Sequence, residues 1–141
     1  MNAKHIFQTN NLLGVSLFRF YLLRFFYVII ILMLGIEVWK KIITYEEAWE
    51  PLPAVAYSFW ASFSALALLG IIHPLKMLPL LLVQFTYKLI WLIIVAYPLW
   101  KTNQLSESTA MGLTEANSIG IIIDLLIIPW PYVYKTYIRR N

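Results

Sequence analysis

Long and nearly continuous apolar runs alternate with short polar segments along the chain. The runs lack the strict alternation of apolar and polar residues that a membrane β-strand requires, so each run is expected to be helical. A helix needs about 20 residues to cross the hydrocarbon core of a bilayer, and the runs approach that length. The pattern predicts four membrane-spanning helices, over residues 16–39, 54–72, 77–100 and 113–137.

The polar segments indicate where these helices end. Lys40 and Lys41 close the first run. His73 and Pro74 separate the second run from the third, which predicts a tight turn and therefore an antiparallel hairpin. Residues 101–115 form the longest polar stretch, which is expected to be either a loop or the beginning of the last helix.

The last apolar run is interrupted by prolines. Pro129 and Pro131 predict that the fourth helix either kinks or ends there. If the helix ends at Ile128, Asp124 lies nearer the inner membrane surface. If the helix continues to Tyr137, Asp124 lies nearer the outer surface. The sequence leaves both alternatives open.

The composition excludes a water-soluble domain. Hydrophobic residues make up 61% of the 141 residues and charged residues only 13%, whereas soluble domains contain about 25% charged residues. A soluble domain of this length has no interior large enough for so much apolar surface. We therefore expect an all-α integral membrane protein, a membrane-embedded antiparallel four-helix bundle that forms a single domain over residues 1–141.

The basic residues predict the orientation in the membrane. Seven of the eleven fall on the side that holds the N-terminus, the His73 turn and the C-terminus, which predicts that both termini are cytoplasmic. These seven are Lys4, Arg19, Arg24, Lys76, Lys135, Arg139 and Arg140. Because the charges cluster at the ends of the helices, the net charge of +4 favours contact with the lipid bilayer over nucleic-acid binding.

Several kinds of chemistry are not expected. The chain contains no cysteine, which excludes disulfides, thiol catalysis and cysteine-ligated metals. Its two histidines, His5 and His73, are far apart, so no metal site is expected. The sequence has no Gly-rich phosphate loop, G-x-S-x-G or H-E-x-x-H motif. We expect neither enzymatic activity nor a cofactor.

The most unusual residue is Lys88, halfway along the third apolar run. A lysine at the centre of a membrane helix costs roughly 2.5–3.5 kcal/mol on insertion scales, so it is expected to face a partner or a wet cavity. Asp124, the only acidic residue inside the last apolar run, is the obvious partner. Gln84 lies one helical turn before Lys88 and Trp91 about one turn after it. Gln84, Tyr87 or Thr86 is expected to fill the remaining hydrogen-bonding capacity of the pair.

Three interpretations of this cluster remain open. The first is a buried ion pair that determines which helices face each other. The second is a ligand pocket in which Lys88 holds an anionic or carbonyl group among aromatic side chains. Those side chains would be Tyr57, Trp60, Tyr87 and Trp91. The third is proton or ion movement through Lys88 and Asp124, although four helices without an internal repeat leave little room for alternating access.

Two surface features complete the set of candidates. Glu37 is expected to form a surface pair with Lys40 or Lys41 near the outer end of the first helix. The second helix carries small residues spaced three or four apart, which would let another helix approach closely. They are Ala54, Ser58, Ala61, Ser62 and Ala65. We favour packing within the monomer, and a homo-oligomer through this stripe is the alternative.

Residues 55–100, VAYSFWASFSALALLGIIHPLKMLPLLLVQFTYKLIWLIIVAYPLW, resemble a set of uncharacterised small bacterial membrane proteins, and the likeness continues more weakly over IPWPYV, residues 128–133. The number and size of the helices are also similar to DoxX-like proteins, four-helix membrane proteins linked to quinone, redox or stress functions. The resemblance implies a bacterial cytoplasmic (inner) membrane. It identifies no functional residue.

The sequence thus predicts a small, multi-pass binding or accessory membrane protein with a polar site around Lys88 and Asp124. A lipid or small amphipathic molecule is the expected ligand. A proton- or ion-coupled transporter or channel that acts as an oligomer is the alternative. A redox- or quinone-associated membrane protein is the third reading.

Overall fold

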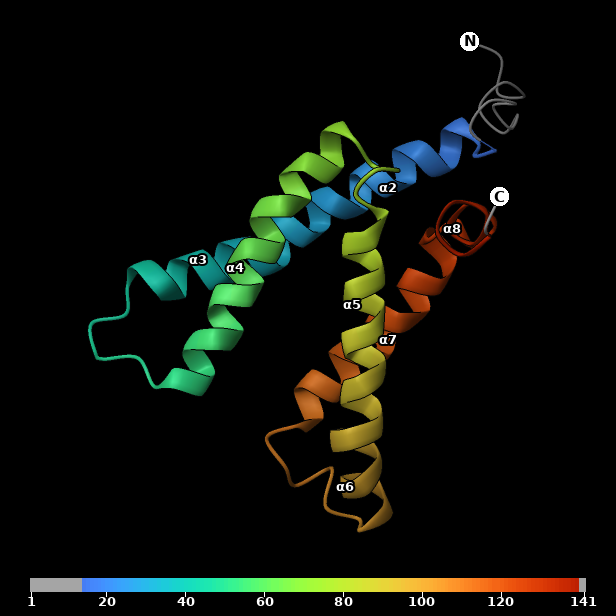
Figure 1. The fold of residues 1–141 in the computed structure, drawn as a ribbon. Helices are drawn as coiled ribbons and strands as arrows, with labels where there is room; N and C mark the ends of the chain where they lie inside the picture. The colour runs from blue at the N-terminus through green and yellow to red at the C-terminus, as the bar shows by residue number, and fades with distance from the viewer. Residues whose placement is uncertain (1–13, 140–141) are drawn as a thin grey trace. The chain divides into compact units, whose positions relative to one another are not determined.

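The computed structural model describes residues 14–139, and all the regular secondary structure in that part of the chain is helical (Figure 1). The helices form two compact units, Met1–Leu80 and Leu81–Asn141. The predicted all-α class is confirmed.

Three helical stretches are long and apolar enough to cross a membrane: Leu17–Ile43, Pro51–Ile72 and Leu78–Lys101. A fourth is added if the bent pair Met111–Ile127 and Trp130–Ile138 is counted as one span. These stretches match the four apolar runs of the sequence, with boundaries shifted by a few residues.

The first stretch is one continuous helix of 27 residues, composed of α2 (Leu17–Ile30), η1 (Ile31–Gly35) and α3 (Ile36–Ile43). In η1 the backbone has the wider π-helical form. Ser16 caps the start of α2, because its Oγ accepts a hydrogen bond from the backbone N–H of Arg19 at 3.3 Å.

The first helix is longer than its sequence predicted. Lys40 and Lys41 were expected to close it, but both lie in the last turn of α3, which continues to Ile43. Lysines are favourable there because the carbonyl end of a helix carries partial negative charge.

The second stretch is a single helix, α4 (Pro51–Ile72), which starts three residues before the predicted residue 54. Pro51 occupies the first turn, where its missing N–H leaves no intrahelical hydrogen bond unmade. Residues 73–77 then lead into α5, so the tight turn expected at His73 and Pro74 is present.

Within the first unit, small residues allow close contact between α2–η1–α3 and α4. Tyr27 is fully buried, and its ring lies where a Cβ on Gly70 would be. The Tyr27 hydroxyl donates a hydrogen bond to the backbone carbonyl of Pro74 at 3.3 Å. Gly35 lies against Ser64, whose Oγ also accepts a hydrogen bond from Trp39 Nε1 at 3.2 Å.

The small residues that make this contact are not those of the predicted stripe. Ala61 is buried, as are Ser64, Ala67 and Gly70. In contrast, three other members of the stripe are exposed: Ser58, Ser62 and Ala65. Small residues at three- and four-residue spacing therefore do pack within the first unit, but most of the buried ones lie on a face of α4 next to the predicted stripe.

The second unit is built on a continuous helix composed of α5 (Leu78–Trp91), η2 (Leu92–Ala96) and α6 (Tyr97–Lys101). Asn103, with a φ of 53°, is in the left-handed conformation just beyond α6. Asparagine tolerates that conformation better than most residues, and the chain turns there into the loop that precedes the last helices.

The last apolar run is broken at Pro129, where the sequence predicted that the helix kinks or ends. Helix α7 (Met111–Ile127) is followed by α8 (Trp130–Val133) and the π-helical η3 (Tyr134–Ile138), and the two parts are bent by 74°. Ile128 is extended, with φ −64° and ψ 126°, because a residue that precedes proline is disfavoured in the helical conformation.

Candidate functional site

Lys88 and Asp124 form a buried ion pair between α5 and α7. The Lys88 Nζ atom lies 2.9 Å from Asp124 Oδ2. Lys88 is 5% exposed and Asp124 is fully buried. The structure thus brings together the lysine of the third apolar run and the aspartate of the last one. Their opposite charges make the pair as a whole electrically neutral.

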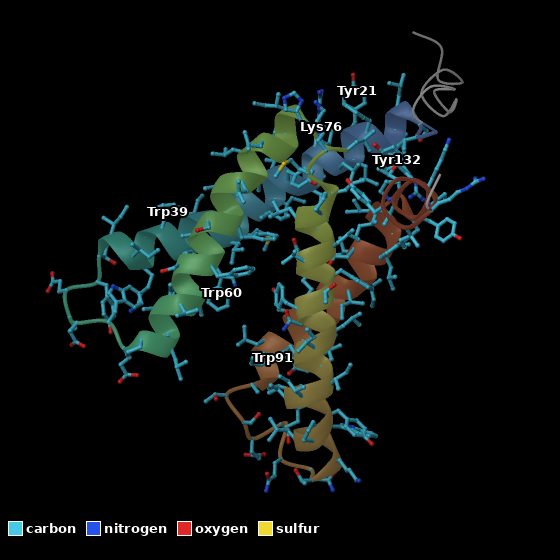
Figure 2. The ribbon with its side chains drawn as sticks, viewed as in Figure 1. Tyr21, Trp39, Trp60, Lys76, Trp91 and Tyr132 are labelled. Carbon is cyan, nitrogen blue, oxygen red and sulfur yellow. The ribbon has the colours of Figure 1, made fainter. Side chains whose placement is uncertain are left out.

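Two further hydrogen bonds extend this contact along the same pair of helices. Trp91 Nε1 donates to Thr114 Oγ1 at 3.2 Å, and the Tyr87 hydroxyl donates to Asn117 Oδ1 at 3.5 Å. Trp91 lies on the middle of the long helix that contains α5 (Figure 2). We call the six residues of these three contacts the polar ladder: Tyr87, Lys88 and Trp91 of α5 with Thr114, Asn117 and Asp124 of α7.

The ladder follows from the side-chain spacing on both helices. On α7, the buried residues Thr114, Asn117, Ile121 and Asp124 recur at intervals of three and four, which places them on one face. On α5, Lys88 and Trp91 are three residues apart. The polar groups therefore meet along one seam, and an otherwise apolar pair of helices is held in a defined register.

Gly120 gives Lys88 the space to reach across α7. A Cβ on Gly120 would lie 2.5 Å from Lys88 Nζ and 2.8 Å from its Cε. The lysine side chain thus crosses the α7 backbone at the one position on this face that has no side chain. Asp124 lies one turn further on, in the last turn of α7, where the helix carbonyls carry partial negative charge.

The pair leaves hydrogen-bonding capacity unused. Asp124 Oδ1 is buried and has no hydrogen-bond partner, and the same is true of Gln84 Oε1. The sequence predicted that Gln84, Tyr87 or Thr86 would complete the pair, but the Thr86 hydroxyl donates to the carbonyl of Leu82 at 2.7 Å. That prediction is wrong in its detail, because the Tyr87 hydroxyl is directed to Asn117 instead and Gln84 Oε1 contacts no donor.

Tyr57 and Trp60 belong to the first unit rather than to the ladder. Their rings are 5.7 Å apart in an edge-on arrangement, and Tyr57 also contacts Trp49 with ring centroids 5.1 Å apart. Trp49 in turn stacks on Tyr45 at 4.0 Å. This aromatic cluster surrounds the loop between α3 and α4, and its placement beside Lys88 stays a prediction.

Glu37 is exposed on α3 and makes no ion pair with Lys40 or Lys41. The expected surface pair is therefore absent. Lys41 instead places its Nζ 4.9 Å from the centre of the Tyr45 ring, a cation–π contact. Glu37 takes no part in the polar ladder.

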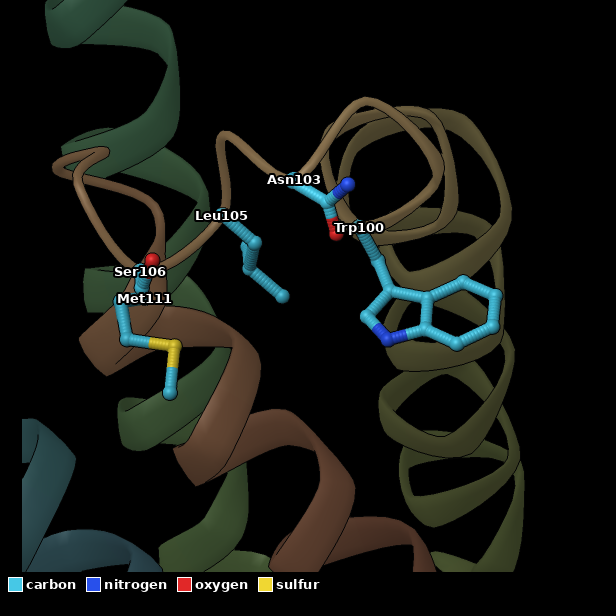
Figure 3. Close-up of a pocket in the computed structure, with 5 residues that line it drawn as sticks. All are labelled: Trp100, Asn103, Leu105, Ser106 and Met111. Carbon is cyan, nitrogen blue, oxygen red and sulfur yellow. The ribbon is translucent and has the colours of Figure 1, made fainter.

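Two open grooves lie beside the loop that joins α6 to α7. One, of about 240 Å³, is lined by Trp100, Asn103, Leu105, Ser106 and Met111 (Figure 3). The other, of about 370 Å³, includes the ladder residue Thr114 in its lining. Lys88 and Asp124 line neither of these two grooves.

Among residues 14–139, no group of three or more His, Cys, Asp or Glu side chains is placed to hold a metal ion. The chain matches no protein-family model, no curated protein and no solved structure.

Sequence reasoning missed three residues of this site: Thr114, Asn117 and Gly120. A usable signal was present, since Thr114, Asn117 and Asp124 share one helix face in a run that is otherwise mostly apolar. Gly120 gave no such signal, because a helical glycine reveals its role only when the side chain that crosses it is known.

Proposed function

We propose that the chain is a multi-pass protein of a bacterial cytoplasmic membrane, one antiparallel four-helix bundle with both termini cytoplasmic. The proposal is supported by the three to four helices that are long and apolar enough to cross a bilayer. It is further supported by the large apolar side chains exposed along them, such as Leu52 and Met33. Water would disfavour such a surface, whereas lipid chains would cover it.

We further propose a binding or accessory role, non-enzymatic, in which the polar ladder holds the polar group of a small amphipathic molecule. The observation that carries this proposal is the pair of buried acceptors without partners, Asp124 Oδ1 and Gln84 Oε1. A buried acceptor that lacks a donor costs about 1–3 kcal/mol. A ligand that supplies a hydroxyl or amide N–H would recover that cost.

The charge of the site restricts the class of ligand. Lys88 and Asp124 already neutralise each other at 2.9 Å, so a charged ligand would leave a net charge buried between apolar helices. A neutral group that both donates and accepts fits better. It would donate to Asp124 Oδ1 and accept from Lys88, whose ammonium carries three donors.

A purely structural role explains the site less completely. Replacing a buried ion pair by apolar residues of similar volume is often neutral or even stabilising, so two helices need no such pair to adhere. Ionisable residues inside a membrane are rare and usually serve a function.

The test is a density map of the protein in lipid nanodiscs, purified without added ligand, together with native mass spectrometry of the same sample. We expect density beside Asp124 Oδ1 and a bound neutral molecule. The double variant Lys88→Met with Asp124→Leu removes both charges, and it should lose that molecule.

The matched control is Trp39→Phe, which removes a hydrogen bond to Ser64 in the first unit and should retain the bound molecule. A dry contact between Lys88 and Asp124, with no bound molecule in the wild type, would overturn the binding role. The ion pair would then serve only to fix the register of α5 against α7.

A second candidate is proton- or ion-coupled transport. It is favoured by the break at Pro129, five residues after Asp124, because transporters commonly place ion sites beside interrupted membrane helices. Proteoliposomes loaded with a pH-sensitive dye distinguish the two functions. Transport requires proton flux that the Lys88→Met, Asp124→Leu variant abolishes, whereas a binding role requires none.

A further inference from the structure

The segment that follows the helix break is shorter than α7 and strongly bent relative to it. It contains α8 and η3, residues 130–138, and runs at 74° to α7. The break is fixed at its start by Trp130, whose Nε1 donates to the carbonyl of Leu125 at 3.0 Å. The Trp130 ring also meets Phe85 of α5 edge-on at 5.3 Å.

If α7 crosses the bilayer, the bend leaves this segment little further depth to reach. With its 17 residues, α7 is about 25 Å long, close to the hydrocarbon thickness of about 30 Å. The nine residues from Trp130 to Ile138 add about 14 Å of helix. At an angle of 74° to α7, they extend the depth reached by only about 4 Å.

The side chains suit a membrane surface. Tyr134 and Ile138 are 59% and 65% exposed and lie four residues apart, so they share a face. Lys135 is exposed on η3, and Arg139 is exposed directly after its end. Tyr132, from the same segment, lies on α8 (Figure 2). No acidic residue follows Asp124 in the chain.

We propose that α8 and η3 lie along the membrane surface and bind the headgroups of anionic phospholipids through Lys135 and Arg139. Tyrosines are favoured at the boundary between headgroups and hydrocarbon, where the ring is buried and the hydroxyl stays hydrated. Each basic residue at an anionic surface contributes attraction of its own, and no carboxylate in the segment opposes it. This inference rests on the proposed membrane-spanning role of α7.

Depth measurements test the placement. Because the chain has no cysteine, single fluorophores can be attached to Thr136→Cys or Ile123→Cys in the full chain in nanodiscs. We expect the label at position 136 to be quenched most by lipids that carry a nitroxide at the headgroup. The label at position 123, on α7, should be quenched most by lipids that carry it at mid-chain.

The two labels separate the two proposals. If aqueous iodide quenches both strongly, α7 does not span the membrane and the proposed membrane role fails as well. If position 123 is deep and position 136 is either fully aqueous or equally deep, α7 spans but the surface placement of α8 and η3 is overturned.

Lipid preference tests the partner. Two nanodisc samples contain the same mixture of phosphatidylcholine and phosphatidylglycerol. In one sample phosphatidylcholine carries an acyl-chain nitroxide near the interface, and in the other phosphatidylglycerol carries it. The label at position 136 should report a preference for phosphatidylglycerol, and Lys135→Gln with Arg139→Gln should reduce that preference on the order of tenfold.

The matched control is Lys40→Gln with Lys41→Gln, which removes the same charge from exposed residues of α3. This control should leave the preference at position 136 unchanged. An equal loss in both double variants would indicate a general effect of net charge, and an absence of preference in the wild type would exclude anionic lipid as the partner.

Discussion

The side chain of Lys88 lies across Gly120, so that its ammonium reaches Asp124 only because α7 has no Cβ at that position. The lysine is thereby confined between two helices and is 5% exposed. The contact couples three properties: the spacing of α5 and α7, the register between them, and the position of a buried charge.

We predict that Gly120→Ala destabilises the protein by about 1–3 kcal/mol, because the new Cβ overlaps the end of a lysine held in an ion pair. The gain in helix propensity, about 1 kcal/mol, offsets part of that cost. Thermal unfolding in detergent measures the difference. Gly112→Ala is the control, since its Cβ would meet nothing within 4 Å and should be neutral or stabilising. Equal effects at both positions would contradict the overlap.

Removing one charge of the pair should be far more damaging than removing both. Lys88→Ala leaves Asp124 buried and unpaired, so we expect a loss of roughly 3–5 kcal/mol. Lys88→Met with Asp124→Leu replaces the pair by apolar side chains and should recover much of that loss. Unfolding free energies of the variants decide the matter. A double variant no more stable than either single one would show that the pairing contributes nothing to folding.

A close contact at a glycine can also be tested in the first unit, where no charged side chain takes part. Gly70→Ala would place a Cβ where the ring of Tyr27 lies, and that side chain is fully buried. We expect a cost of about 3 kcal/mol, the upper end for overpacking. Tyr27→Phe, which keeps the ring and removes the hydrogen bond to Pro74, should cost about 0.5–1.5 kcal/mol. In a Tyr27→Leu background the penalty at Gly70 should shrink, and a constant penalty would place the strain elsewhere.

The sequence predicted the helices and the ion pair from strong, local signals. Apolar runs of about 20 residues leave few alternatives to membrane-length helices. A lysine and an aspartate that are each alone in such a run have few other partners, so Lys88 and Asp124 could be matched without a structure. The cost of an unpaired buried charge makes that match nearly obligatory.

Details that depend on three-dimensional contact were not predictable in the same way. Of the predicted stripe on α4 only Ala61 is buried, because small residues occur all round the helix and spacing alone does not distinguish Ser62 from Ser64. The surface pair of Glu37 failed because exposed lysines gain little from a carboxylate, and Lys41 finds Tyr45 instead. Gly120 became recognisable only once the path of Lys88 was known.

A single indole makes a hydrogen bond across the broken end of α7. Trp130 Nε1 donates to the carbonyl of Leu125, which lies in the last turn of α7 and would otherwise have no donor where Pro129 interrupts the helix. Trp130→Phe keeps an aromatic ring against Phe85 but removes that donor. We expect a loss of about 0.5–1.5 kcal/mol, the net contribution of one hydrogen bond, because this contact is exposed.

Amide hydrogen exchange shows which part of the chain Trp130→Phe destabilises. Exchange should accelerate at the N–H groups of Ile128 and of α8, while those near Gly35 in the first unit stay unchanged. Tyr132→Phe, on the same short helix, is the matched variant, and the structure gives its hydroxyl no such role. If the two variants lose equal stability, the Trp130 hydrogen bond does not hold the break, and the bend at Pro129 is maintained by the proline geometry alone.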